Sequence, residues 1–169
     1  MATVKFLNAA GKYGDPGARA AVIAYITQKE KTPHGYVGSA AVDLTGAAQQ
    51  MQAVAESFKK DNKVRIRHFV VSFYPGEIKG PGQANFVALM LSSELAQRYQ
   101  CVYAVHEDTD HVHFHIVFNP VSYVDGHKYS GSKEEHHMLK QLIWRHIRGL
   151  GVKKFYEVKY HPTPYDAYE

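Results

Sequence analysis

The chain has 169 residues and a single cysteine, Cys101, so no disulfide bond can form within it. A lone cysteine is typical of proteins in a reducing compartment, and we therefore expect a cytoplasmic protein. No segment approaches the roughly 18 to 20 consecutive apolar residues that a membrane span requires. The N-terminal residues also lack the charged and then apolar segments of a secretory signal peptide. We therefore expect no insertion into a membrane.

The chain has only a small excess of one charge, with a formal net charge of +4. This excess is compatible with a polyanionic partner but does not identify one. Hydrophobic residues make up 45% of the chain, which is ordinary for a folded globular protein. The unusual components are 11 histidines and 12 tyrosines, and several of the histidines lie close together in the sequence.

The hydrophobic periodicity predicts both strands and helices along the chain. We expect Thr45 to cap one helix, and Ser132 with Glu135 to form a capping box at the start of the last helix. We expect residues 32–44 to be irregular, and the last 15 or so residues have no clear pattern. The predicted strands are 2–8, 64–74, 101–107 and 112–119, and the predicted helices are 18–31, 45–60, 83–98 and 132–150. These elements predict one α+β domain over residues 1–169, with a central antiparallel β-sheet flanked by α-helices.

The segment 106–119 contains the densest group of histidines. Side chains alternate between the two faces of a strand, so His113 and His115 share one face. The other face carries Phe114, Ile116 and Phe118 and must be buried. His106 lies on the preceding strand, where a tight hairpin through residues 108–111 can place it opposite His113. Three imidazoles in this arrangement predict a metal site that leaves positions open for a substrate.

A His-x-His pair on a strand can also be a solvated polar face. The third histidine across the hairpin, with Asp108 and Asp110 beside it, favours the metal site. We interpret His111 as a turn residue, and His136 and His137 as surface residues at the start of the last helix.

Three segments of the sequence resemble motifs of a known family. Residues 104–119, AVHEDTDHVHFHIVFN, closely resemble the third motif of the P-class conjugative relaxases, which belong to the HUH endonucleases. Residues 24–32, AYITQKEKT, resemble the first motif, and residues 68–77, HFVVSFYPGE, resemble the second. The first motif precedes the histidine pair, which is the order found in relaxases rather than in single-tyrosine transposases. The resemblance implies an enzyme that nicks DNA at an origin of transfer.

The resemblance also implies a role for each motif residue. Tyr25 would be the nucleophile, and Ser72 would help to hold DNA beside the scissile phosphate. Asp108 would either orient a histidine ligand through its second nitrogen or accept the tyrosine proton, and the sequence does not choose between these roles. The implied metal is Mg²⁺ or Mn²⁺, although three imidazoles would also suit Zn²⁺. Tyr36 and Tyr129 are other candidates for the nucleophile.

The implied partners are single-stranded origin-of-transfer DNA and the accessory and coupling proteins of a relaxosome. Cationic residues are expected to bind the DNA phosphates. The candidates are Lys29, Lys31, Arg65, Arg67 and Lys128, together with Lys133, Arg145 and Arg148.

Two other functions fit the same residues. One is an inactive module that holds a metal ion and binds origin DNA without cutting it. The other is a metallo-phosphoesterase that uses water as its nucleophile and never forms a bond to DNA.

Overall fold

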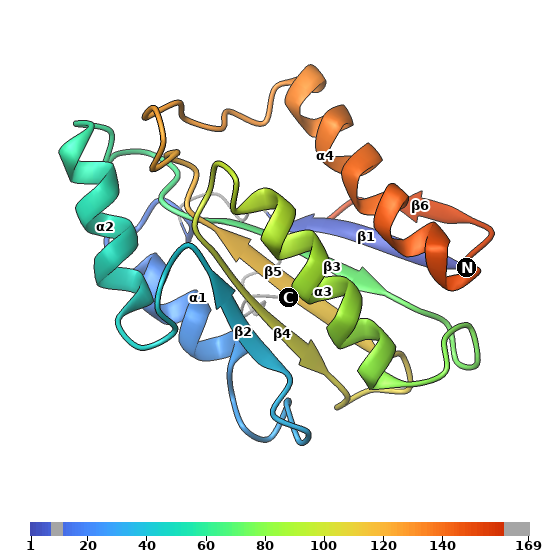
Figure 1. Cartoon of the computed structure of the whole chain (residues 1–169). Coiled ribbons are helices and arrows are strands. Elements are labelled where there is room, and N and C mark those ends of the chain that lie inside the picture. Colours follow the sequence, from blue (N-terminus) through green and yellow to red (C-terminus); the bar gives the residue numbers. More distant parts are fainter. Residues whose placement is uncertain (8–11, 161–169) are drawn as a thin grey trace.

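A computed structural model describes residues 1–7 and 12–160. Its centre is a six-stranded sheet with the strand order β2-β4-β5-β3-β1-β6 (Figure 1). Neighbouring strands are antiparallel except β1 and β6, which are parallel. The strands are β1 (Ala2–Leu7), β2 (Val37–Ala40), β3 (Arg67–Ser72), β4 (Cys101–His106), β5 (His113–Phe118) and β6 (Phe155–Glu157). The predicted α+β fold with a central, mostly antiparallel sheet is confirmed.

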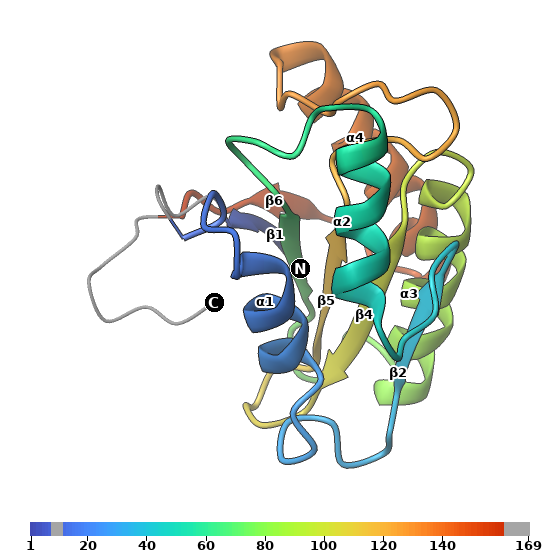
Figure 2. The same cartoon turned by 90° about the vertical axis from the view of Figure 1, so that its left-hand side faces the viewer.

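The helices lie on both faces of the sheet (Figure 2). Helices α3 (Pro81–Leu95) and α4 (Lys133–Ile147) pack on one face, and α1 (Ala18–Ile26) and α2 (Ala47–Ser57) pack on the other. A short 3₁₀ turn, Arg148–Leu150, follows α4. Among the described residues, no helix is both long and apolar enough to cross a membrane.

Strand β5 lies inside the sheet, between β4 and β3, and all six of its residues are buried. Phe114, Ile116 and Phe118 pack into the larger apolar cluster beneath α3 and α4, as predicted. The opposite face carries His113 and His115 and is covered only in part by α1 and α2. Strand alternation therefore places the histidines and the main core on opposite sides of one strand.

Two strands were not predicted from the sequence. Segment 32–44 was expected to be irregular but contains β2, which pairs with β4 from Val37 to Ala40. The short strand β6 lies in the C-terminal segment that had no clear pattern, and it pairs with β1. Both strands form the edges of the sheet, and both are short. Such strands depend on a partner strand that is distant in the sequence, so their local pattern is weak.

Helix α1 ends five residues earlier than predicted, at Ile26 rather than at residue 31. The hydroxyl of Thr27 donates to the carbonyl of Ile23 at 2.7 Å, and Thr32 makes the same kind of bond to Gln28. Local side-chain bonds of this kind compete with the helical pattern. Pro33 also disfavours a helical conformation at the residue before it.

The two predicted helix caps have different outcomes. Ser132 is the N-cap of α4, as predicted, and its hydroxyl accepts a hydrogen bond from the backbone N–H of Glu135 at 3.2 Å. The other half of the predicted capping box differs, because the Glu135 carboxylate accepts from the backbone N–H and the hydroxyl of Ser130 and not from the N–H of Ser132. Thr45 was wrong as a cap. Helix α2 begins after Gly46, which has a φ of 82° and no side chain to bond the first turn. That left-handed conformation favours glycine and moves Thr45 out of the capping position.

We expect Ser132→Ala to lower the free energy of unfolding by about 1 kcal/mol, because one N–H of the first turn loses its acceptor. Urea denaturation of the purified protein measures this loss. Thr45→Ala is the matched control and should leave the free energy of unfolding unchanged. Equal effects of the two substitutions would contradict the assignment of the caps.

Candidate metal centre and active site

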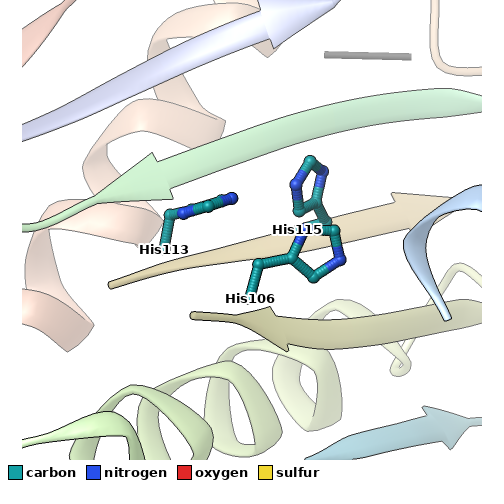
Figure 3. A group of neighbouring side chains, drawn as sticks. All are labelled: His106, His113 and His115. Carbon is teal, nitrogen blue, oxygen red and sulfur yellow. The ribbon is translucent and has the colours of Figure 1, made fainter. Parts of the chain in front are cut away.

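Three histidines converge on the face of the sheet that carries α1 and α2, near one end of β4 and β5 (Figure 3). His106 at the end of β4 pairs in register with His113 at the start of β5, and His115 lies two residues further along β5. One nitrogen from each ring lies within 4.8 Å of the others. All three side chains are buried. The structure therefore brings together the three residues that the sequence predicted as metal ligands.

The outward nitrogen of each ring has its own partner. His106 Nε2 donates to the carbonyl oxygen of Ile26 at 2.7 Å, and His113 Nδ1 donates to the carbonyl oxygen of His111 at 2.9 Å. His115 Nδ1 lies 2.7 Å from Nε2 of His68. A neutral imidazole that donates through one nitrogen has a lone pair on the other. The fold thus provides the outer contacts that usually orient histidine ligands of a metal ion.

The chemistry of these rings fits a cation. The Nε2 atom of His115 is buried and makes no hydrogen bond. A buried polar atom of this kind is costly unless a partner arrives. Burial lowers the pKa of His106 to about 4 and holds the pKa of His115 well below its usual value. Both rings are therefore neutral at pH 7, which is the form that binds metal.

Tyr25 lies beside the histidines, in the last turn of α1. Its ring makes edge-on contacts with His106 and His115, at centroid distances of 6.5 and 6.4 Å. The ammonium group of Lys31 lies 5.0 Å from the centroid of the same ring. Lys31 also donates to Asp108 at 3.0 Å. The tyrosine of the first motif, the histidines of the third motif and an ion pair thus meet at one place.

The ion pair between Lys31 and Asp108 raises the pKa of Lys31 and lowers the pKa of Asp108. Partial burial opposes the charge of Lys31, but the hydrogen bond to Asp108 and the proximity of Tyr25 raise its pKa. Partial burial likewise acts against the Asp108 carboxylate, but the bond from Lys31 lowers the pKa of that carboxyl below its usual value. Each partner therefore keeps the other charged.

Asp108 does not hold the second nitrogen of any of the three histidines. Those nitrogens contact the carbonyl groups of Ile26 and His111 and the ring of His68. Oxygen Oδ1 of Asp108 instead lies 4.0 Å from His113 Nε2, the nitrogen on the other side of that ring. The first role expected for Asp108 was to orient a histidine ligand through its second nitrogen. In this structure other groups contact those nitrogens.

Ser72, at the end of β3, lies on the same face of the sheet as the histidines. It pairs in register with His113 on one side and with Thr3 of β1 on the other. A hollow of about 290 Å³ opens beside these residues and is also lined by Lys5 and Thr109. The hollow borders His113 and His115, so a bound chain could extend from the histidines over β3 towards β1.

The expected DNA-binding cations are not gathered at this site. Arg65 binds Asp61 and the carbonyl of Gly14. Arg67 lies at the opposite end of β3 from Ser72, with its guanidinium over the ring of Tyr129. The ammonium of Lys128 bonds to two oxygens of Asn62 and to the carbonyl of Lys60. Of the five main candidates, only Lys31 contacts the residues around the histidines, and Lys29 is exposed nearby in the chain.

His111, His136 and His137 lie where the sequence predicted, and the two other candidates for the nucleophile, Tyr36 and Tyr129, pack elsewhere. His111 lies in the turn of the hairpin and contacts the carbonyl of Phe73. His136 contacts Glu157, and His137 is exposed. Tyr129 is buried in the core cluster of the opposite face. Tyr36 stacks on His34.

Sequence reasoning missed Tyr13, whose hydroxyl oxygen lies 3.0 Å from His68 Nδ1, and it missed Lys5, Thr3 and the carbonyl of Ile26. It quoted His68 within the second motif without assigning it a role. The positions of Lys5 and Thr3 could be predicted only in part from the sequence. Both share a face of β1 by alternation, but no local feature indicates that β1 pairs with β3.

Comparison with known proteins identifies the family of the chain. The model of the relaxase family described as "MobA/VirD2-like, nuclease domain" matches residues 25–148. A Protein rlx of Staphylococcus aureus is 31% identical over 121 residues, which is 70% of this chain and 38% of that protein. The group II intron-interrupted relaxase LtrB of Lactococcus lactis subsp. cremoris is 32% identical over 75 residues, 44% of this chain and 13% of that relaxase. Protein MobA of Acidithiobacillus ferrooxidans is 34% identical over 61 residues, 36% of this chain and 15% of that protein.

The chain thus spans well under half of the length of these relatives. The family match begins at Tyr25 and includes all three histidines, Ser72 and Asp108. The chain belongs to the MobA/VirD2-like relaxases of the HUH type, and the matched region is their nuclease domain.

Proposed function

We propose that this domain nicks one DNA strand at an origin of transfer, with Tyr25 as the nucleophile and a metal ion on His106, His113 and His115. The observation that carries the proposal is the contact of the Tyr25 ring with two of the three histidines. A helical tyrosine with small apolar neighbours is usually a packing residue. Here its ring is only partly buried, and it lies against imidazoles that can hold a cation.

The proposed reaction is a transesterification. The phenol oxygen of Tyr25 forms a bond to phosphorus as the bond from phosphorus to the 3′ oxygen of the preceding nucleotide breaks. The phenol loses its proton and the departing 3′ oxygen gains one, so the products are a 5′-phosphotyrosine and a free 3′-OH. The bond energy of the phosphodiester is kept in the new ester, so the same site can rejoin the strand.

A divalent ion, Mg²⁺ or Mn²⁺, would sit on the three histidines and polarise the oxygens of the phosphate. The chain's own part is to hold three imidazoles with one nitrogen of each directed to one place. Zn²⁺ also suits three nitrogen ligands.

Lys31 and Asp108 would act on the phenol of Tyr25. The ammonium group of Lys31 lies over the tyrosine ring and favours negative charge on the phenol oxygen as its proton leaves. Asp108 anchors that ammonium group at 3.0 Å. We therefore propose that Asp108 acts chiefly through Lys31, and that any role as proton acceptor is secondary.

Ser72 and the hollow beside it would hold the DNA strand next to the scissile phosphate. The hollow is lined by Ser72, Thr3 and Lys5, whose hydroxyl and ammonium groups are of the kinds that bind phosphate. Lys29 would add positive charge on the side of α1. Arg65, Arg67 and Lys128 already bind other groups of the chain, so they are weaker candidates for binding DNA near the site.

The wider setting follows from the family and stays a proposal. The domain would cover residues 1–169 and act in the cytoplasm on single-stranded origin DNA, with accessory and coupling proteins of a relaxosome as partners. The two alternatives are a domain that binds DNA without cutting it and a phosphoesterase that uses water.

We expect Tyr25→Phe to abolish the covalent adduct, because the atom that bonds to phosphorus is absent, while DNA binding persists. The substrate would be a tiled set of single-stranded oligonucleotides that covers the DNA flanking the gene, with Mg²⁺ or Mn²⁺. Mass spectrometry of tryptic peptides then locates the nucleotide adduct. Tyr129→Phe is the control, because Tyr129 is buried on the opposite face of the sheet, and it should form the adduct normally.

The same assay separates the three functions. An adduct that persists in Tyr25→Phe would refute the assignment of the nucleophile. Turnover of DNA by the wild type without any adduct supports the phosphoesterase. A wild type that binds but never cuts any oligonucleotide with either metal supports the binding module.

We expect His113→Ala to lose binding of Mn²⁺ and nicking together, because it removes one of three ligands. Isothermal titration calorimetry measures the metal affinity, and the oligonucleotide assay measures nicking. His137→Ala removes an exposed histidine of α4 and should change neither quantity. Nicking by His113→Ala at the wild-type rate would exclude this metal centre.

A further inference from the structure

A fourth histidine lies directly behind the metal-ligand candidates. His68 of β3 is 2% exposed and pairs in register with two apolar residues, Leu7 of β1 and Val117 of β5. Leu7 and Val117 belong to the apolar cluster beneath α1 and α2. An imidazole in such a position is expensive to bury unless both of its nitrogens have partners.

Both nitrogens of His68 do have partners. Nε2 lies 2.7 Å from Nδ1 of His115, and Nδ1 lies 3.0 Å from the hydroxyl oxygen of Tyr13. Tyr13 precedes α1 in the chain and is 3% exposed. The result is a buried row of three groups, His115, His68 and Tyr13, that leads away from the candidate metal centre.

The protons of this row can be arranged in two directions. In the first, His115 Nδ1–H donates to His68 Nε2, and His68 Nδ1–H donates to the hydroxyl oxygen of Tyr13. In the second, the hydroxyl of Tyr13 donates to His68, and His68 donates to His115. The second direction places the proton of His115 on Nε2, where it is buried without an acceptor. The first direction leaves a lone pair on that same atom, which faces the other two histidines.

We propose that His68 is the positioning residue of the metal centre, and that Tyr13 supports it by accepting a hydrogen bond from His68 Nδ1–H, so that His115 presents Nε2 to the ion. This inference rests on the metal centre proposed above. His106 and His113 are oriented by backbone carbonyls, which no substitution removes. For His115 the partner of the outward nitrogen is instead a side chain, that of His68, so a residue of the second motif orients this ring.

A purely structural role for His68 makes a different prediction from a positioning role. A packing residue affects the stability of the metal-free protein and leaves the affinity for metal unchanged once the protein is folded. A positioning residue affects the affinity itself, because His115 then samples orientations and tautomers that do not bind the ion.

The test measures binding of Co²⁺ to the full chain without DNA. Co²⁺ is the probe because its visible absorption bands also report the ligand geometry. We expect His68→Phe to weaken Co²⁺ affinity about 10- to 100-fold, the usual effect of removing an outer partner of a histidine ligand. His68→Gln restores one acceptor and one donor at the end of the side chain, so it should recover most of the affinity. Thermal unfolding of the metal-free variants shows that each is folded.

Tyr13→Phe is the milder test, because it removes one oxygen atom and keeps the ring. We expect the affinity for Co²⁺ to fall about three- to tenfold, which corresponds to the loss of one hydrogen bond. Tyr99→Phe is the matched control. Tyr99 is also a buried tyrosine, but it packs in the cluster on the opposite face, and its substitution should leave the affinity unchanged.

The outcomes distinguish this inference from the function on which it rests. A wild type that binds no Co²⁺ would refute the metal centre itself. A wild type that binds Co²⁺ and a folded His68→Phe variant that binds it equally well, with the same absorption bands, would refute the role of His68 alone. An effect of Tyr99→Phe as large as that of Tyr13→Phe would show that the row has no special role.

Discussion

Each imidazole has two nitrogens, and a metal site built from three of them requires that one nitrogen of each ring be held while the other stays available. Here a helix end, a hairpin turn and a neighbouring histidine each hold one ring. The three contacts come from segments far apart in the sequence. The site therefore depends on the whole sheet being assembled, and not only on the hairpin that carries the histidines.

The apolar face of β5 supplies the free energy that offsets the cost of burying the histidines on its other face. Phe114, Ile116 and Phe118 are fully buried beneath α3 and α4, and each contributes roughly 1.5–3 kcal/mol by leaving water. That contribution offsets the desolvation of His113 and His115 on the opposite face. Because neighbouring residues of one strand point to opposite sides, the apolar residues hold the strand in register and the histidines take their positions as a consequence.

The early end of α1 connects the fold to the chemistry. The last carbonyl groups of a helix have no partner within the helix. The carbonyl oxygen of Ile26 accepts the hydrogen bond from His106. Tyr25 is the residue before Ile26 in the chain. The chain then turns, so that Lys31 reaches both the tyrosine ring and Asp108. A helix continued to residue 31, as its composition predicted, would have kept the Ile26 carbonyl in a helical hydrogen bond and denied His106 its partner.

The sequence alone was enough to predict the α+β class, the two faces of β5, and the three histidines on one side of the hairpin, because the period of two along a strand is a local property. The motifs also indicated Tyr25, Ser72 and Asp108. Tertiary structure was needed for the rest. It paired β1 with β3 and so brought Lys5 and Thr3 beside Ser72, and it placed His68 and Tyr13 behind His115. These contacts join residues 47 or more positions apart, or strands whose pairing no local pattern specifies. Strand pairing follows from how the apolar faces pack together, and that packing is a property of the whole fold.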